Sequence, residues 1–195
     1  AIDFRSELDL IRYIRREFSE DEVELRLDAN GAFDLKEAKE KLDRMADYHI
    51  HYIEQPIRAG QWQEMARLVE DSPIRIALDE ELIGINDPAR QKELMNTISP
   101  KILILKPALI GGFAASDAWT AQVESIGGYR IITSALESNI GLNAIAQYAA
   151  QKPSPHAHGL GTGKLYTNNF PSPYHVDASG LHYRRDQKWD FSALL

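Results

Sequence analysis

The stretch Val23-Glu24-Leu25-Arg26-Leu27-Asp28 decides the fold class, because it alternates apolar and charged residues and ends on a carboxylate. Such alternation is typical of a short β-strand. A short apolar segment ending on a charged residue returns at Glu54, 26 residues later, then at Asp79 after 25 residues and at Lys106 after 27. Each interval has room for one helix and one strand. The sequence therefore predicts repeated strand–helix units in which a charged residue ends each strand.

Apolar residues at helical spacing occupy the intervals between these strands. Asp34-Leu35-Lys36-Glu37 is a capping-box start, and Asp87-Pro88 is a cap followed by a first-turn proline. Helices are expected over residues 7–18, 34–45, 62–69, 87–96, 112–119 and 140–148. Strands are expected over residues 23–27, 51–54, 74–78, 102–105 and 129–133, with a sixth over 156–160.

Strands that alternate with helices run parallel, which leaves an open doubly wound sheet or a closed (β/α)8 barrel. Convergence of charged strand ends at one mouth favours the α/β TIM-type barrel. Six strands are expected where closure needs eight, so the first two strands and an N-terminal capping domain are expected to precede residue 1. We assign residues 1–163 to barrel strands three to eight and residues 164–195 to a C-terminal extension that packs on the capping domain. Unpaired edges and an exposed apolar face at Leu8 and Ile11 are expected to make the chain alone poorly soluble.

Composition and net charge limit the classes of function that fit this chain. The 195 residues are 44% hydrophobic and 26% charged, which is ordinary for a globular protein. A net charge of -7 disfavours nucleic acid and anionic membrane as partners. The absence of cysteine excludes disulfides and thiolate chemistry and fits the cytoplasm. No apolar run approaches the roughly 20 residues of a membrane span.

Three carboxylates, Asp28, Glu54 and Asp79, are expected side by side on the barrel rim. Unpaired, they would raise one another's pKa, and a divalent cation removes that cost. Ligation by oxygen alone suits Mg²⁺ better than zinc or copper. Lys106, directly after the apolar run 102–105, can then act as an acid, a base or a stabiliser of an enolate.

The strand ends also carry a resemblance. They read Leu27-Asp28-Ala29-Asn30-Gly31, Tyr52-Ile53-Glu54-Gln55-Pro56, Leu78-Asp79-Glu80-Glu81 and Leu105-Lys106-Pro107. Together these motifs resemble successive strand ends of the enolase superfamily, in its muconate-lactonizing branch. Within that branch the chain is most similar to the o-succinylbenzoate synthase family, from about residue 2 to residue 163.

The resemblance implies a set of roles. Asp28, Glu54 and Asp79 would be ligands of Mg²⁺, for which Mn²⁺ could substitute, and Lys106 would be the catalytic lysine of the sixth barrel strand. Other residues implied are Asn30 and Glu80, which would orient the ligands, and Ser134, Ser138 and Gly161, which would bind the substrate. Ser138 is equally well explained as the cap of the next helix.

The implied reaction dehydrates 2-succinyl-6-hydroxy-2,4-cyclohexadiene-1-carboxylate through an enediolate, a step of menaquinone biosynthesis. A small-molecule carboxylate is thus the expected substrate, the capping segment the expected partner, and a homo-oligomer is compatible with the family. The family's acid/base is a lysine in a Lys-x-Lys motif that ends the second strand, and this sequence has no such motif. We therefore expect this chain to be inactive alone.

Two functional alternatives stay open. A dipeptide epimerase or N-acylamino acid racemase of the same branch would use the same metal and paired lysines. Dipeptide epimerases typically carry Asp-x-Asp at the eighth strand end, where this chain has Gly159-Leu160-Gly161-Thr162, and this favours the dehydratase. The second alternative is a non-catalytic barrel fragment that serves as a binding module.

Two other motifs are weaker. The segment 159–163 contains Gly-x-Gly but lacks the third glycine of a dinucleotide-binding turn. The histidine pairs 49/51 and 156/158 have zinc-compatible spacing, but no third nitrogen or sulfur ligand is expected nearby, so zinc is disfavoured.

Overall fold

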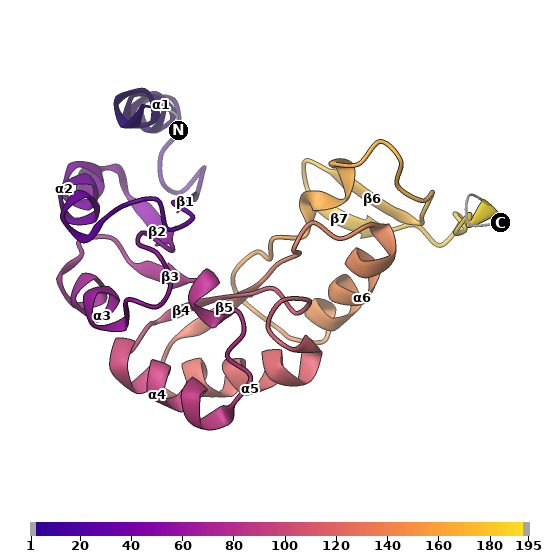
Figure 1. Cartoon of the computed structure of the whole chain (residues 1–195). Coiled ribbons are helices and arrows are strands. Elements are labelled where there is room, and N and C mark those ends of the chain that lie inside the picture. The colour runs from indigo at the N-terminus through magenta and orange to yellow at the C-terminus, as the bar shows by residue number, and fades with distance from the viewer. Residues whose placement is uncertain (1–2, 193–195) are drawn as a thin grey trace.

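The structure, a computed structural model, describes residues 3–192. Five parallel strands form one sheet in the order of the chain: β1 (Leu25–Asp28), β2 (Ile50–Glu54), β3 (Ile76–Leu78), β4 (Ile102–Leu105) and β5 (Tyr129–Ile132). The sheet is curled, with helices along its convex side (Figure 1). This is the partial α/β barrel that the strand–helix spacing predicts.

Helices alternate with the strands as the periodicity predicts, and the first helix precedes β1. They are α1 (Phe4–Glu17), α2 (Leu35–Met45), α3 (Trp62–Asp71), α4 (Pro88–Ile98), α5 (Gly112–Ser125) and α6 (Asn139–Ala150). The capping box at Asp34 forms. The Asp34 carboxylate accepts from the backbone N–H of Glu37, and the Glu37 carboxylate accepts from the backbone N–H of Asp34. Three short 3₁₀ turns, η1 (Ala46–Tyr48), η2 (Glu80–Leu82) and η3 (Gly161–Lys164), are not apparent from the sequence pattern.

The main core lies between the sheet and its helices. Leu42, Met65 and Trp119 are fully buried there. Leu8 and Ile11 of α1 also belong to this core, so the expected exposed face of the first helix is wrong. Their burial follows from α1 packing Leu8 and Ile11 against the core, while Arg12 and Arg16 are exposed and the half-buried Arg15 donates to the Tyr48 and Val23 carbonyls. No helix within residues 3–192 has both the length and the apolar character to cross a bilayer.

The prediction of a sixth strand over residues 156–160 is also wrong, because the pairing is much shorter than expected. Within the described residues it is reduced to one parallel bridge between Thr133 and Gly159. Pro153 and Pro155 precede it, and proline cannot donate a ladder hydrogen bond. Gly159 is required at the bridge, because a Cβ there would lie 2.5 Å from the Thr133 hydroxyl.

The C-terminal part forms a feature that the sequence pattern does not predict. Strands β6 (Tyr174–Asp177) and β7 (Gly180–Tyr183) make an antiparallel hairpin beside α6. Tyr174 packs edge-on against Tyr183 and Trp189, so these aromatic residues of the C-terminal part contact one another. The boundary between residues 163 and 164 falls inside η3.

Candidate metal centre and catalytic lysine

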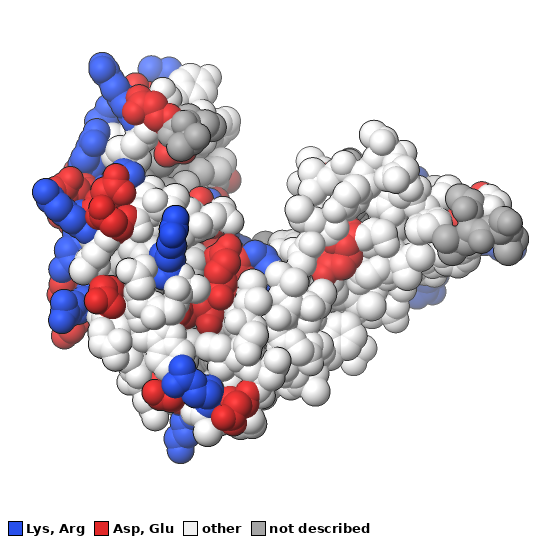
Figure 2. All heavy atoms as spheres, in the orientation of Figure 1, with Lys and Arg blue, Asp and Glu red and all other residues white. Residues whose placement is uncertain are grey.

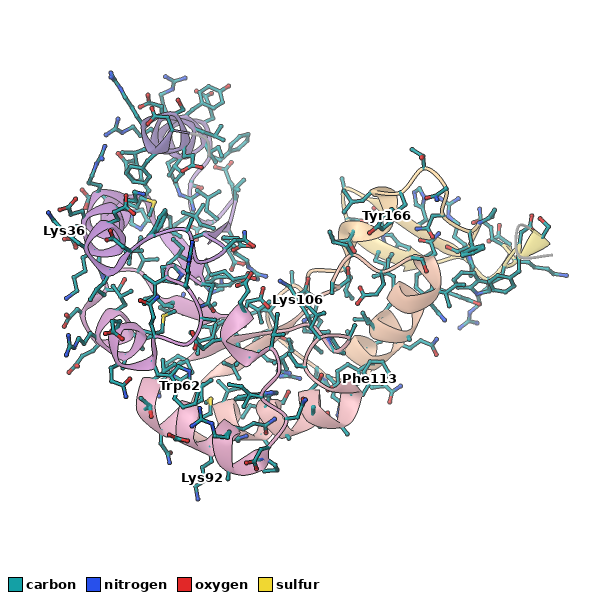
Figure 3. All side chains as sticks on the ribbon, in the orientation of Figure 1. Lys36, Trp62, Lys92, Lys106, Phe113 and Tyr166 are labelled. Atoms are coloured by element: carbon teal, nitrogen blue, oxygen red, sulfur yellow. The ribbon has the colours of Figure 1, made fainter. Side chains whose placement is uncertain are left out.

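The four charged residues lie at the C-terminal ends of neighbouring strands. Asp28 ends β1 and Glu54 ends β2, and the two residues are direct register partners. Asp79 follows β3 and Lys106 follows β4. Because the strands are parallel, all four residues lie at the same end of the sheet. Figure 3 shows Lys106 at the middle of the curled sheet, on its concave side, and Figure 2 shows acidic atoms gathered at the same notch.

Lys106 joins two of the three carboxylates. Its Nζ donates to Asp79 Oδ2 and lies 3.8 Å from Glu54 Oε1. The Asp79 side chain is 1% exposed and that of Glu54 is 13% exposed, so water screens these charges poorly. The site therefore holds three carboxyl groups against one ammonium group, and two of the carboxyl groups, Glu54 and Asp79, are shielded from water, whereas Asp28 is exposed.

The pKa shifts report this excess of negative charge. Burial, followed by the charges of Asp28 and Asp79, raises the pKa of Glu54 to about 9. The pKa of Lys106 is also raised: burial opposes the shift, but the contact with Asp79 and the charge of Glu54 outweigh it. Without a further positive charge, Glu54 thus holds a proton at neutral pH while Lys106 stays cationic.

The donor set fits a hard divalent cation. Asp79 Oδ1 is buried and has no hydrogen-bond partner, although an unpaired buried carboxylate oxygen is costly. A cation between Asp28, Glu54 and Asp79 would satisfy this oxygen and replace the proton on Glu54. These residues could therefore hold Mg²⁺, with every ligand an oxygen.

The two residues expected to orient the ligands lie beside them. Asn30, at φ 47°, donates its backbone N–H to Asp28 Oδ1 at 2.9 Å, so its contact with the carboxylate is through the main chain. Glu80 follows Asp79 directly, and its Oε2 is buried without a partner. Burial and the charge of Asp79 raise the pKa of Glu80.

Gln55 is a site residue that the sequence analysis missed. Its side chain is fully buried, and its Oε1 accepts from the backbone N–H groups of both Asp79 and Glu81, each at 3.2 Å. Its Nε2 donates to the Ile57 carbonyl at 2.9 Å and to Glu81 Oε2 at 3.2 Å. Gln55 thereby connects the C-terminal end of β2 to the C-terminal end of β3 by hydrogen bonds. Its position directly after Glu54 in a strand-end motif is the sequence feature that could have identified Gln55 as a site residue.

The expected substrate-binding residues lie on the next two loops around the sheet. Ser134 is buried after β5, where its Oγ shares a hydrogen bond with the Thr162 hydroxyl and accepts from Leu136 N–H. Ser138 takes the N-cap position of α6, but its side chain makes no capping bond. Gly161 opens η3 with free space where a Cβ would stand.

The histidines pair differently from the sequence expectation. His49 is exposed and contacts Glu20, and His158 accepts from the backbone of Ile132. His51 instead meets His156, and with Glu24 as third group these residues form a cluster whose ligand atoms lie within 4.8 Å of one another. The third group of this cluster is a carboxylate, a ligand type that the sequence expectation did not consider.

The comparisons with known proteins agree with this fold. Residues 2–184 match the family described as enolase C-terminal domain-like, and the chain belongs to that family. It is 50% identical over 181 residues to the o-succinylbenzoate synthase of Desulfotalea psychrophila, an alignment that covers 93% of this chain and 49% of that protein. The crystal structure of MenC from the same organism superimposes with a TM-score of 0.88 at 48% identity, over 92% of this chain and 50% of that chain.

A relative with a different activity is more distant. The L-Ala-D/L-Glu epimerase of Bacillus subtilis is 27% identical over 152 residues, which cover 77% of this chain and 40% of that protein. The chain spans about half the length of the curated relatives that it matches.

Proposed function

We propose that this chain supplies the metal-binding half of a cytoplasmic, Mg²⁺-dependent o-succinylbenzoate synthase of menaquinone biosynthesis. The observation that carries the proposal is the placement of Asp28, Glu54 and Asp79 beside Lys106 at one end of a partial barrel, with Asp79 buried and Asp28 at the exposed rim. The 50% identity to a protein named o-succinylbenzoate synthase selects this reaction within the family. The substrate is a small carboxylate, and the partner is a capping segment like the part of the relatives that this chain does not span.

Lys106 stabilises negative charge in this mechanism. When bound, a divalent cation provides the Lewis acidity that makes the proton beside the substrate carboxylate easier to remove. Lys106 stays cationic in its acidic surroundings, so it supports the enediolate electrostatically and is not the base. The base takes the C–H proton and then protonates the leaving hydroxyl, and water departs as the ring becomes aromatic. We assign that base to the Lys-x-Lys segment of the family, outside this chain.

Ser134, Ser138 and Gly161 are the proposed substrate contacts. They lie after β5 and after the Thr133–Gly159 bridge. The Ser134 hydroxyl and the backbone N–H groups near Gly161 can donate to an anionic substrate group, since glycine lets a ligand approach the main chain closely.

The test is turnover by the full-length protein. It should convert the cyclohexadiene precursor to o-succinylbenzoate with Mg²⁺ and lose that activity with excess chelator. Asp79→Asn should reduce the rate strongly, because it removes a ligand charge. The matched control, Asp87→Asn, changes an exposed helix cap to another good capping residue and should leave the rate unchanged. Full turnover in chelator would contradict the proposal.

The second candidate is dipeptide epimerisation, which the 27% identical B. subtilis epimerase favours. The same preparation should be offered L-Ala-L-Glu. Epimerisation without dehydration would move the assignment to that activity. Failure of both reactions with an intact metal site would favour the non-catalytic barrel fragment.

A further inference from the structure

We propose that Glu24, His51 and His156 form a second metal site, at the end of the barrel opposite the carboxylates, and that it takes Zn²⁺ or a similar nitrogen-preferring ion. Each residue offers one ligand atom, and the three atoms lie within 4.8 Å of one another. They come from three separate segments: the residue before β1, the irregular part of β2 and the loop before Gly159. The proposal does not depend on the proposed function.

His51 supplies the observation that points to a ligand. Its side chain is 8% exposed, and its Nδ1 lies 3.1 Å from Glu24 Oε1. This nitrogen is nevertheless shielded from solvent and makes no hydrogen bond of acceptable geometry. A buried nitrogen facing a carboxylate without a hydrogen bond is costly. A cation bound by both atoms removes the cost.

A hydrogen bond to Tyr129 can fix the tautomer of His51 that metal binding requires. The Tyr129 hydroxyl lies 3.0 Å from His51 Nε2. When Nε2 carries the proton and donates it to this hydroxyl, the lone pair of the ring is on Nδ1, facing Glu24. Metal-binding histidines commonly donate their other ring N–H in this way, which fixes ring and tautomer. The Tyr129 ring also stacks on His156 with centroids 4.1 Å apart, so one side chain positions two of the ligands.

The site is distinct from the carboxylate centre. Glu24 precedes Asp28 by four residues and His51 precedes Glu54 by three. At about 3.3 Å per strand residue, the two groups are roughly 10–13 Å apart along the strands. Ligand bonds to a metal are only about 2.0–2.3 Å long, so one ion cannot serve both groups.

The surrounding charges decide which ion fits. Arg26 donates from Nε to Glu24 Oε1 at 2.6 Å and from Nη1 to the Ala157 carbonyl at 2.8 Å, which holds Glu24 near the segment of His156. Arg26 also neutralises the one carboxylate, so a hard cation that needs several anionic oxygens is disfavoured. Two imidazoles and one carboxylate are a common zinc set, with a fourth position left for water.

The experiment measures Zn²⁺ binding to the full-length protein by titration calorimetry in excess Mg²⁺, which keeps the carboxylate centre filled. Co²⁺ absorption then reports the ligand geometry. His51→Asn and His156→Asn are the test variants. His49→Asn is the matched control, because His49 is an exposed histidine outside the cluster at φ 48°, a conformation that asparagine tolerates.

The wild-type protein and His49→Asn should bind one more Zn²⁺ than either test variant, or bind it at least about tenfold more tightly, which is the smallest effect expected when even a supporting group is lost. His156 lies on a partly exposed loop, so His156→Asn tests the site even where His51→Asn disturbs folding. Equal Zn²⁺ binding by all four proteins, or no Zn²⁺ binding by the wild type in excess Mg²⁺, would overturn the proposal.

Discussion

Gln55→Met removes the connection between two proposed metal-ligand strands while keeping the size of the side chain. Three main-chain groups lose a buried partner: the N–H groups of Asp79 and Glu81 and the carbonyl of Ile57. Each lost hydrogen bond costs about 1 kcal/mol, and more where a buried group stays unpaired, so we expect roughly 3 kcal/mol of lost stability. The backbone of Asp79 also loses the hydrogen bond that holds it in place. Loss of such a supporting contact typically lowers metal affinity about 10–100-fold.

The assay combines urea unfolding of the full-length protein with Mn²⁺ binding followed by electron paramagnetic resonance. Gln91→Met is the matched control, because Gln91 is also buried and its amide bonds to the Ile85 carbonyl and to Gln122, away from the carboxylates. The control should lose stability, by about 1–2 kcal/mol, without losing Mn²⁺ affinity. Unchanged Mn²⁺ affinity in folded Gln55→Met would refute the reasoning and leave Gln55 a merely structural residue.

Two further predictions concern charge and completeness. In the metal-free fold the pKa of Glu54 is raised to about 9. Between about pH 4.5 and pH 9 the native state therefore holds a proton that the unfolded chain has released. The free energy of unfolding of the metal-free protein should fall as the pH rises through this range. Urea unfolding in chelator at pH 5, 7 and 9 checks this, and a Glu54→Gln variant with an equally steep decline would contradict it. The second prediction is that residues 1–195 alone do not dehydrate the substrate, whereas the same chain joined behind the first half of the Desulfotalea psychrophila relative does. Light scattering and a turnover assay on both proteins check this, and a monodisperse, active chain alone would show that no outside base is needed.

The sequence predicts the strand–helix order well because each unit repeats one pattern. The alternation before Asp28 and the apolar run before Lys106 are local signals, and both segments form strands. The loop around His156 shows the limit. Its few apolar residues suggest a strand, but strand pairing is a long-range property, and the prolines before it leave only the bridge at Gly159.

The same limit applies to side chains that act at a distance from their neighbours in sequence. Gln55 contacts Glu81 across 26 positions, and His51 meets His156 across the barrel. No spacing rule connects such pairs, because the first contact depends on the pairing of β2 with β3 and the second on the curl of the sheet. The four charged strand ends were accessible from sequence, since parallel strands bring their C-terminal ends together whatever the helices between them.

The most direct test of the account is the position of the metal. Crystals of the full-length protein grown with Mn²⁺ should show one anomalous peak at about 2.1–2.2 Å from carboxylate oxygens of Asp28, Glu54 and Asp79, with Lys106 Nζ no longer bonded to Asp79. A peak that any one of the three carboxylates cannot reach, or no peak at this end of the sheet, would contradict the central claim.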